Sequence, residues 1–316
     1  MRVSITSKIP ANILKKIKEN FEVKYHDSET PLSKAEIIEG LADCDALVCP
    51  LSDKIDEEII DGAVDLKIIA NYGAGFDNID INAAAKRNIV VTNAPAPSSA
   101  VSTAELTFAL ILMIARDMLR AEKNLRDGNF KGWRPTYFLG EQLKSKTLGI
   151  IGLGNIGKNL AKRALSFEMN VVYHSRNRKE DVENLGVKYM ERDDLIRSAD
   201  FLSLHTAFSP ELRHMISDRE FELMPESAYL INAARGPLVD ERALICALTE
   251  GKIRGAALDV YEFEPKISDE LLELENVVLM PHLGNATYDA RREMGEAVLD
   301  NLMDFKEGQR PRNKVN

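Results

Sequence analysis

Short apolar runs alternate with amphipathic stretches over residues 1–97. Five runs have the length of a buried strand, at 3–6, 21–25, 46–49, 66–70 and 89–92. The stretches between them repeat their apolar residues at helical spacing, at 11–19, 33–41, 56–63 and 81–87. This alternation predicts a parallel sheet that is covered by helices.

The same alternation resumes after residue 146. Strand-like runs lie at 148–151, 171–173, 201–205, 229–232, 256–260 and 277–280, and helical stretches lie at 217–224 and 241–248. A last helix is predicted over 287–305, and we expect it to return to the first domain because too little chain follows for another sheet. The predicted fold class is α/β with two doubly wound parallel-sheet domains, one built from 1–98 plus 286–316 and the other from 99–285.

The segment between the two patterns begins with a proline-rich crossing at 93–99 and continues as a helix from about Ser102 into the region of Lys123. Its apolar run, 106–115, is too short to span a bilayer and predicts a buried helix. An irregular aromatic segment with the only tryptophan, Trp133, follows. This segment is either a small cluster packed on its own domain or an arm that packs on a second subunit. We favour the arm, and with it a homodimer.

A glycine-rich turn joins the strand at 148–151 to the next helix, with the sequence Gly-Leu-Gly-Asn-Ile-Gly at 152–157. In such a unit the first glycine permits a tight turn, the second lets the backbone approach a pyrophosphate, and the third lets the helix pack on the strand. The N–H groups at the helix start, from Asn155 on, can bind the phosphates. The turn therefore predicts a dinucleotide-binding domain at 99–285.

The end of the second strand of that unit bears on which dinucleotide is bound. NAD-binding units carry Asp or Glu there, which accepts hydrogen bonds from the adenosine ribose. This chain has Ser175, whose hydroxyl group can donate to a 2′-phosphate, and Arg176 and Arg178, whose guanidinium groups can pair with it. The alternative is a solvated basic loop. We expect NADP(H) to be preferred, with NAD(H) possible.

Charge and cysteine content narrow the class of protein. The net charge of −9 argues against general binding to nucleic acid or to a membrane surface, so anionic ligands need local arginines and backbone N–H groups. Cys44, Cys49 and Cys246 form no CxxC pair and have no His at ligand spacing, which fits reduced thiols and predicts no metal site. The start of the chain lacks the apolar stretch of a signal peptide, so we expect a cytoplasmic protein.

Three loops that follow strands of the second domain carry Arg235, Glu264 and His282, with Glu262 as a weaker candidate for the acid. The carboxyl ends of parallel strands share one edge of the sheet, so these side chains can meet. Reduction of a 2-keto acid needs a cation for the substrate carboxylate and a proton for the carbonyl oxygen, which the arginine and the histidine can supply. A neighbouring carboxylate would keep that histidine protonated. In the first domain, the turn at 71–78 is either an ordinary strand-to-helix turn or a site for a small carboxylate.

Together these residues resemble the D-isomer-specific 2-hydroxyacid dehydrogenase family, especially its glyoxylate/hydroxypyruvate reductase-like members. The resemblance covers nearly the whole chain. Its motifs are Gly-Leu-Gly-Asn-Ile-Gly at 152–157, Asn-Ala-Ala-Arg-Gly at 232–236, Leu-Asp-Val-Tyr-Glu-Phe-Glu-Pro at 258–265, Pro-His-Leu-Gly at 281–284, Gly-Ala-Gly-Phe-Asp-Asn-Ile-Asp at 73–80 and Thr-Ala-Glu-Leu at 103–106. The chain departs from many relatives at Ser175-Arg176, where NAD-using members carry Asp, and at Ala207, where many carry proline.

The resemblance implies a Rossmann-type cofactor domain inserted into a flavodoxin-like substrate domain, with the active site in the cleft and usually a dimer through the cofactor domains. It implies that Arg235, Glu264 and His282 are catalytic. The residues expected to bind the cofactor are Thr103, Gly152, Gly154, Asn155, Ile156, Gly157, Ser175, Arg176, Arg178, His205, Thr206, Ala233 and Asp259. The residues expected to bind the substrate are Leu51, Tyr72, Gly73, Ala74, Gly75, Arg235 and His282.

We therefore expect an oxidoreductase that transfers a hydride between NADP(H) and a small 2-keto acid, glyoxylate or hydroxypyruvate first. His282 would be the proton donor and a D-2-hydroxy acid the product. Two alternatives remain open. One is a protein that senses NAD(P)(H) to control assembly, and the other is an NAD-linked dehydrogenase of a bulkier D-2-hydroxy acid.

Overall fold

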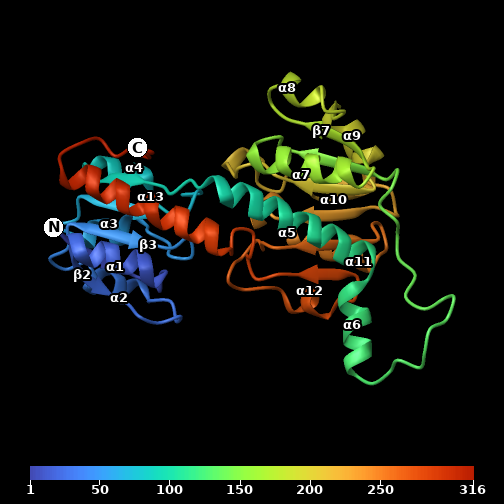
Figure 1. Cartoon of the computed structure of the whole chain (residues 1–316), viewed down its shortest axis with the longest axis horizontal. Helices are drawn as coiled ribbons and strands as arrows, with labels where there is room; N and C mark the ends of the chain where they lie inside the picture. Colours follow the sequence, from blue (N-terminus) through green and yellow to red (C-terminus); the bar gives the residue numbers. More distant parts are fainter. The chain divides into compact units, whose positions relative to one another are not determined.

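The computed structural model describes residues 1–316 and divides the chain into two compact units. Unit 1 comprises Met1–Ser99 and Asn285–Asn316, and unit 2 comprises Ala100–Gly284. Each unit contains one parallel sheet with helices on both faces (Figure 1). These sheets confirm the predicted α/β class with two parallel-sheet domains.

The sheet of unit 1 has the strand order β2-β1-β3-β4-β5, which is the order of flavodoxin-like folds. Its strands are β1 (Arg2–Ile5), β2 (Glu22–Tyr25), β3 (Ala46–Cys49), β4 (Ile68–Asn71) and β5 (Val90–Thr92). Its helices are α1 (Ala11–Asn20), α2 (Lys34–Gly40), α3 (Glu57–Gly62), α4 (Ile81–Lys86) and α13 (Tyr288–Lys306).

Two hydrophobic cores cover the two faces of the unit 1 sheet, because neighbouring residues of a strand point to opposite faces. On β3, Leu47 belongs to the core that α2, α3 and α4 cover, and Val48 belongs to the core that α1 and α13 cover. Helix α13 supplies Met294, Val298 and Leu302 to that second core. The segment 285–316 therefore helps to cover a sheet whose strands all lie in the first hundred or so residues.

The sheet of unit 2 has the strand order β12-β11-β10-β9-β6-β7-β8. Numbered within the unit, its first six strands follow the dinucleotide-binding order 3-2-1-4-5-6, and a seventh strand extends one edge. The strands are β6 (Thr147–Ile151), β7 (Asn170–His174), β8 (Lys188–Tyr189), β9 (Phe201–Leu204), β10 (Tyr229–Asn232), β11 (Gly255–Leu258) and β12 (Val277–Leu279). The strand order reverses between β6 and β9, and ligands of such sheets bind beyond the carboxyl ends of the strands at this point.

Helices cover both faces of the unit 2 sheet. They are α5 (Pro97–Ala115), which begins in unit 1, α6 (Met118–Arg126), α7 (Asn155–Ser166), α8 (Glu180–Glu183), α9 (Arg192–Ser198), α10 (Asp218–Leu223), α11 (Glu241–Thr249) and α12 (Asp269–Glu273). Two 3₁₀ turns, Pro210–Leu212 and Gly236–Leu238, interrupt the loops after β9 and β10. The helices α9, α10, α11 and α12 pack on one face, and α5 and α7 pack on the other.

The single helix predicted from Ser102 to the Lys123 region is wrong in two respects. Helix α5 begins earlier, at Pro97, a residue that suits the first turn of a helix because it needs no N–H partner there. The helical path then breaks at Asp117, which adopts a left-handed conformation with φ of 49°, and α6 follows. Single Asp residues tolerate this conformation better than most, so the break needs no glycine.

Helix α5 is longer than the apolar run at 106–115, and by length and composition it could cross a membrane. Buried helices in the cores of other proteins have the same length and composition. Half of α5 is buried inside the protein, and Ala104, Phe108, Leu110 and Ile111 belong to the hydrophobic core beside β6. Packing within unit 2 therefore accounts for the buried half of α5.

Candidate active site

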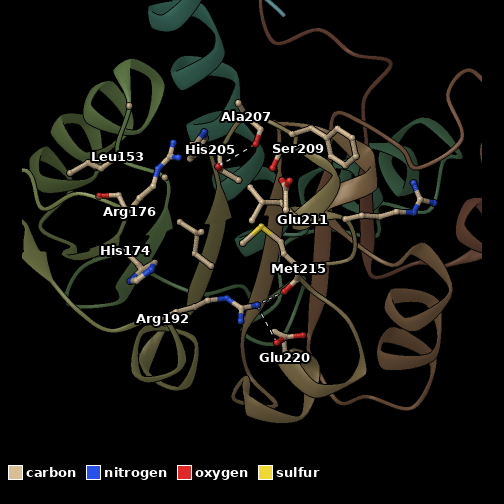
Figure 2. A pocket seen from close by; sticks show the side chains of 18 of the residues that line it. Leu153, His174, Arg176, Arg192, His205, Ala207, Ser209, Glu211, Met215 and Glu220 are labelled. Atoms are coloured by element: carbon tan, nitrogen blue, oxygen red, sulfur yellow. Dashed lines mark hydrogen bonds and ion pairs between the residues drawn. The ribbon is translucent and has the colours of Figure 1, made fainter. Parts of the chain in front are cut away.

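A groove of about 1250 Å³ opens where the strand order of unit 2 reverses. Gly152 after β6 and His205 after β9 form its floor. The Gly152 backbone has φ of 97°, and a β-carbon there would lie 2.6 Å from the His205 carbonyl oxygen. Only glycine allows the two segments to approach this closely. Figure 2 shows Arg176 on one side of the groove and Ala207 and Ser209 on the other.

The glycine-rich turn leaves room for a pyrophosphate. A β-carbon at Gly154 would meet no atom within 4 Å, so the space above this residue is open. Gly154 is also the N-terminal cap of α7, and no side chain caps the N–H groups of that helix end. At Gly157 a β-carbon would lie 2.5 Å from the Gly152 carbonyl oxygen, which explains why the helix packs tightly on the turn. The open space and the uncapped helix end fit a bound dinucleotide.

The loop after β7 lines the end of the groove that the adenosine is expected to occupy. Ser175, Arg176 and Lys179 line it, and the Ser175 hydroxyl group donates a 2.7 Å hydrogen bond to the carbonyl oxygen of Asn177. The sequence analysis did not single out Lys179, although it continues the same basic run. No side-chain carboxylate from this loop enters the groove.

Arg178 does not line the groove, contrary to the expected cofactor contact. Its guanidinium group forms two 2.7 Å hydrogen bonds to the Glu183 carboxylate and lies over the Tyr189 ring. The hydrogen bonds from Arg178 and from the Tyr173 hydroxyl group lower the pKa of Glu183 to about 2. Sequence spacing alone could not show that Arg178 would pair with a carboxylate five residues away.

His205 is held without charge beneath the groove. Burial lowers its pKa to about 4, so the ring is neutral at pH 7. Its Nε2 atom lies 2.8 Å from the Ser203 hydroxyl oxygen, and its buried Nδ1 atom has no hydrogen-bond partner. A buried polar atom without a partner is costly, and a bound ligand could satisfy it. Thr206 lines the groove beside it.

Three adjacent strands carry the residues that the sequence analysis grouped together. Arg235 follows β10, Glu264 follows β11 and His282 follows β12, and these strands are neighbours in the sheet. The His282 Nδ1 atom lies 2.9 Å from Glu264 Oε2. The other oxygen, Oε1, accepts a 2.9 Å hydrogen bond from the Tyr261 N–H group. The acid and the imidazole therefore meet directly.

The Glu264 carboxylate is stabilised in its ionised form. Burial alone would raise its pKa, but the hydrogen bond with His282, the charge of that ring, the Tyr261 N–H group and the charge of Arg235 together lower it below the ordinary value. An ionised carboxylate at Nδ1 fixes the orientation of the imidazole and leaves Nε2 to face other groups. His282 and Glu264 keep 38% and 35% of their side-chain surface exposed, so substrate can reach the pair.

Glu262, the weaker candidate for the acid, is engaged elsewhere. Its side chain is 4% exposed and lies 2.6 Å from His214 Nε2 and 2.5 Å from the Arg213 guanidinium group. Its second oxygen accepts a hydrogen bond from the Glu241 N–H group. Of the two acids, it is therefore Glu264, the one that the sequence favoured, that lies against His282.

Two residues that sequence reasoning passed over position Arg235. Asn232, which is 1% exposed, donates a 3.0 Å hydrogen bond to the Arg235 carbonyl oxygen and accepts one of 3.1 Å from the Ala234 N–H group. A β-carbon at Gly236 would lie 1.8 Å from the Tyr261 carbonyl oxygen. The Arg235 loop and the Glu264 loop are therefore in backbone contact. Both residues stand in the Asn-Ala-Ala-Arg-Gly motif, but nothing in the sequence indicates these partners.

Asp259 anchors the loop that carries His282. It is 1% exposed, and its two oxygens accept hydrogen bonds of 2.6 and 2.7 Å from the N–H groups of Leu283 and Gly284. Burial raises its pKa, and the two N–H groups partly oppose that shift. A β-carbon at Gly284 would come within 3.3 Å of Thr103 and Asp259, so these residues and the loop pack closely. Asp259 was expected to contact the cofactor, and the contacts seen are with the His282 loop.

In unit 1, four of the residues expected to bind substrate, at 72–75, form one loop after β4, and the fifth, Leu51, follows β3. A β-carbon at Gly73 would lie 2.6 Å from the Leu51 side chain, which covers the loop. The carbonyl oxygens of Gly73, Ala74 and Gly75 accept hydrogen bonds from other parts of unit 1. No acceptor faces the three N–H groups of the same residues in the described chain. These N–H groups suit a small carboxylate, and the segment 72–75 is called the anion-binding loop below.

Parallel-sheet order, the glycine-rich groove and the polar cluster at the ends of β10, β11 and β12 define a dinucleotide-dependent dehydrogenase. The family model for the D-isomer specific 2-hydroxyacid dehydrogenase, NAD binding domain, matches residues 108–284. The chain is 47% identical over its whole length to a Staphylococcus haemolyticus protein that is provisionally named a 2-hydroxyacid dehydrogenase, and the match covers 99% of that protein. The chain belongs to the D-isomer specific 2-hydroxyacid dehydrogenase family, an oxidoreductase family, as the sequence resemblance predicted.

Solved structures agree with this assignment. The TT0316 protein of Thermus thermophilus superposes with a TM-score of 0.93 at 39% identity, with all of both chains covered. The NADPH-dependent glyoxylate/hydroxypyruvate reductase of Sinorhizobium meliloti, solved with NADP and malonate, superposes with a TM-score of 0.87 at 30% identity. That match covers 99% of this chain and 96% of the reductase.

Proposed function

We propose that this dehydrogenase is an NADP(H)-preferring reductase of small 2-keto acids, glyoxylate and hydroxypyruvate first, and that its product is a D-2-hydroxy acid. The observation that carries the proposal is the hydrogen bond between His282 and Glu264. These residues follow two strands of the sheet, and Arg235 follows the neighbouring strand. A cation, an acid and an imidazole are the groups that reduction of a 2-keto acid requires of the protein.

Each of the three side chains has one task in this proposal. Arg235 pairs with the substrate carboxylate through the two-pronged geometry of its guanidinium group. Glu264, ionised, stabilises the protonated ring of His282, whose Nε2–H passes its proton to the carbonyl oxygen as that oxygen gains charge. The dihydronicotinamide, when bound, supplies the hydride that the keto carbon accepts. In the reverse direction His282 takes the proton from the alcohol.

The preference for NADP(H) rests on the loop after β7. Its groove-lining residues include Ser175, Arg176 and Lys179, and none of its side chains places a carboxylate where a 2′-phosphate would lie. Charge-assisted hydrogen bonds from an arginine favour a phosphate group. The S. meliloti reductase is NADPH-dependent by name, which supports the same choice.

The preference for a small substrate rests on the anion-binding loop of unit 1 and on the named activity of the S. meliloti reductase. The N–H groups of Ala74 and Gly75 suit a carboxylate, and Leu51 packs over Gly73 beside them. A side chain in that place restricts the bulk that a substrate can carry next to its carboxylate.

We also propose that the enzyme is a cytoplasmic homodimer. Phe130, Trp133 and Leu139, in the segment that follows α6, expose 51%, 82% and 69% of their surface. Large apolar side chains gathered on one segment are typical of a subunit contact. Tyr137 contacts Phe130 and Phe138, but Trp133 joins no such cluster within the described chain. Light scattering of the wild type and of Trp133→Ser tests the dimer, and a monomeric wild type would contradict it.

A panel of 2-keto acids with NADPH and with NADH tests the activity. We expect the highest kcat/KM with NADPH and a two- or three-carbon keto acid, and a loss of activity in His282→Gln. His26→Gln, which alters a partly exposed histidine of unit 1 that is hydrogen-bonded to the Thr30 carbonyl oxygen, is the matched control and keeps wild-type activity. Absence of turnover with every pair would refute the proposal and favour a nucleotide sensor. Higher activity with NADH and a bulky keto acid would favour the NAD-linked alternative.

A further inference from the structure

Helix α13 of unit 1 carries two neighbouring arginines in opposite environments. Arg292 is exposed and lies within 4.0 Å of the carboxylates of Asp289, Glu293 and Glu296. Arg291 is half-buried, and its guanidinium group has neither an ion pair nor a hydrogen bond in the described chain. A half-buried cation without a counter-charge is unfavourable, so its retention calls for an anion that is not part of the chain.

The position of Arg291 on the helix adds to this imbalance. It lies in the first turns of α13, where the helix dipole is positive and disfavours a cation. Burial lowers its pKa, and the nearby group that opposes this shift is the Tyr72 phenol rather than a carboxylate. No carboxylate contributes to the pKa shift of Arg291, so its guanidinium group lacks a close counter-charge in the described chain.

Arg291 is tied to the anion-binding loop through Tyr72. The Tyr72 hydroxyl group donates a 2.6 Å hydrogen bond to the Arg291 carbonyl oxygen. One turn further along α13, a β-carbon at Gly295 would lie 2.4 Å from that hydroxyl oxygen, so this glycine makes room for the phenol. A glycine inside a helix costs about 1 kcal/mol relative to alanine. The helix accepts that cost at the one place where Tyr72 lies against it.

The residue after Tyr72 begins the run of N–H groups without acceptors, at Gly73, Ala74 and Gly75. Two independent features of unit 1 thus require the same kind of partner, because the N–H groups lack an acceptor and Arg291 lacks a counter-charge. Both meet at Tyr72. A carboxylate bound at the loop would accept hydrogen bonds from the N–H groups and would attract the Arg291 guanidinium group electrostatically.

We propose that Arg291 is a positioning residue for the substrate carboxylate, which it attracts to the N–H groups of Gly73, Ala74 and Gly75. The inference rests on the proposed reduction of 2-keto acids and adds a second cation, besides Arg235, that recognises the acid. It explains why the chain keeps this guanidinium group unpaired while the next residue is surrounded by carboxylates. Arg291 acts through its charge and takes no part in proton transfer.

Steady-state kinetics of Arg291→Gln, Arg291→Lys and Arg292→Gln with saturating NADPH test this role. In Arg291→Gln we expect KM for glyoxylate and the inhibition constant of oxalate to rise by about tenfold, because the variant loses a positive charge that attracts the anion. We expect kcat and the affinity for NADPH to stay within about twofold of wild type, because Arg291 is absent from the proton-transfer step. Arg291→Lys restores most of the lost affinity, and Arg292→Gln keeps the wild-type values.

An effect on folding alone would appear differently. If Arg291→Gln lowers Tm but leaves KM and the oxalate constant unchanged, the inference is wrong while the proposed function stands. Equal effects in Arg292→Gln would also overturn it, because they would show a general effect of surface charge. If the wild type reduces no keto acid, calorimetric titration of oxalate into the wild type and Arg291→Gln still tests the anion site. Equal affinity in the two proteins would then exclude it.

Discussion

Gly236 and Tyr261 are in backbone contact, so close that a β-carbon at Gly236 would lie 1.8 Å from the Tyr261 carbonyl oxygen. The contact joins the loop that carries Arg235 to the loop that carries Glu264. In the second loop, Glu264 Oε1 accepts a hydrogen bond from the Tyr261 N–H group. The distance between Arg235 and Glu264 therefore depends on Gly236 having no side chain.

Replacing Gly236 by alanine separates these loops. We expect a destabilisation of about 2 kcal/mol from overpacking, and a fall in kcat/KM of roughly a hundredfold because small displacements of reacting groups are costly. Thermal melts and keto-acid kinetics measure the two effects. Gly40→Ala is the control, because the nearest atom to a β-carbon there is 3.6 Å away. It should leave kcat/KM unchanged and should not destabilise the protein, because alanine suits a helix better than glycine. Wild-type kinetics in Gly236→Ala would show that the contact does not position Arg235.

Glu264→Gln removes a charge and keeps the shape of the side chain. The pKa of the carboxyl group is lowered in the folded protein, mainly by the hydrogen bond and charge of His282, so the group stays ionised to a lower pH than a free glutamate side chain. A glutamine no longer stabilises a protonated His282, so we expect the reductase activity of the variant to disappear at a lower pH than that of the wild type as pH rises. His282→Gln should lower kcat by roughly a hundred- to ten-thousandfold at every pH. The pH profile of kcat/KM checks both predictions. An unshifted profile in Glu264→Gln would show that Glu264 does not influence proton transfer by His282.

The pair Arg176 and Arg178 offers an internal comparison for the cofactor preference. Arg176 lines the groove, whereas Arg178 is bound to Glu183. We expect Arg176→Ala to raise KM for NADPH by about 10- to 100-fold, the value of a charge-assisted hydrogen bond, and to leave KM for NADH nearly unchanged. Arg178→Ala should alter neither. An unchanged ratio of NADPH to NADH affinity in Arg176→Ala would defeat the assignment of the 2′-phosphate site.

His205 predicts a pH dependence of stability. Its pKa falls from 6.5 in the unfolded chain to about 4 in the folded protein, so the unfolded chain binds a proton that the folded protein rejects in that range. The contribution of the neutral ring is complete above pH 6.5 and is lost as pH falls from 6.5 towards 4. The loss amounts to roughly 3 kcal/mol, from the difference between the two pKa values. Urea unfolding of the wild type and His205→Gln at both pH values tests this, and parallel pH dependence in the two proteins would contradict it.

The sequence predicted those features that depend on the order of elements along the chain. Parallel strands end at one edge of a sheet, so Arg235, Glu264 and His282 could be grouped before any coordinate was known. The sequence did not predict which polar groups pair, because pairing depends on distances across the fold. Arg178 pairs with Glu183 instead of lining the groove, and Glu262 pairs with His214, whereas Glu264 pairs with His282.

Positioning residues were the hardest to predict. Asn232 and Gly236 act through backbone atoms of other loops, and no periodicity or motif spacing encodes such contacts. The break between α5 and α6 was missed for a related reason, because Asp117 adopts its left-handed conformation without glycine or proline as a signal. Features of this kind depend on tertiary context, which overrides local propensity.

The discontinuity of unit 1 has a consequence for synthesis of the protein on the ribosome. One face of its sheet is covered by Met294, Val298 and Leu302, which emerge after every strand of both sheets has been made. The two cores of unit 2 draw on residues 104–280, so that part of the nascent chain can fold before α13 covers the strands of unit 1. The middle of the polypeptide would then reach its native state first, and the N-terminal strands would be the part that most needs protection by chaperones until translation ends.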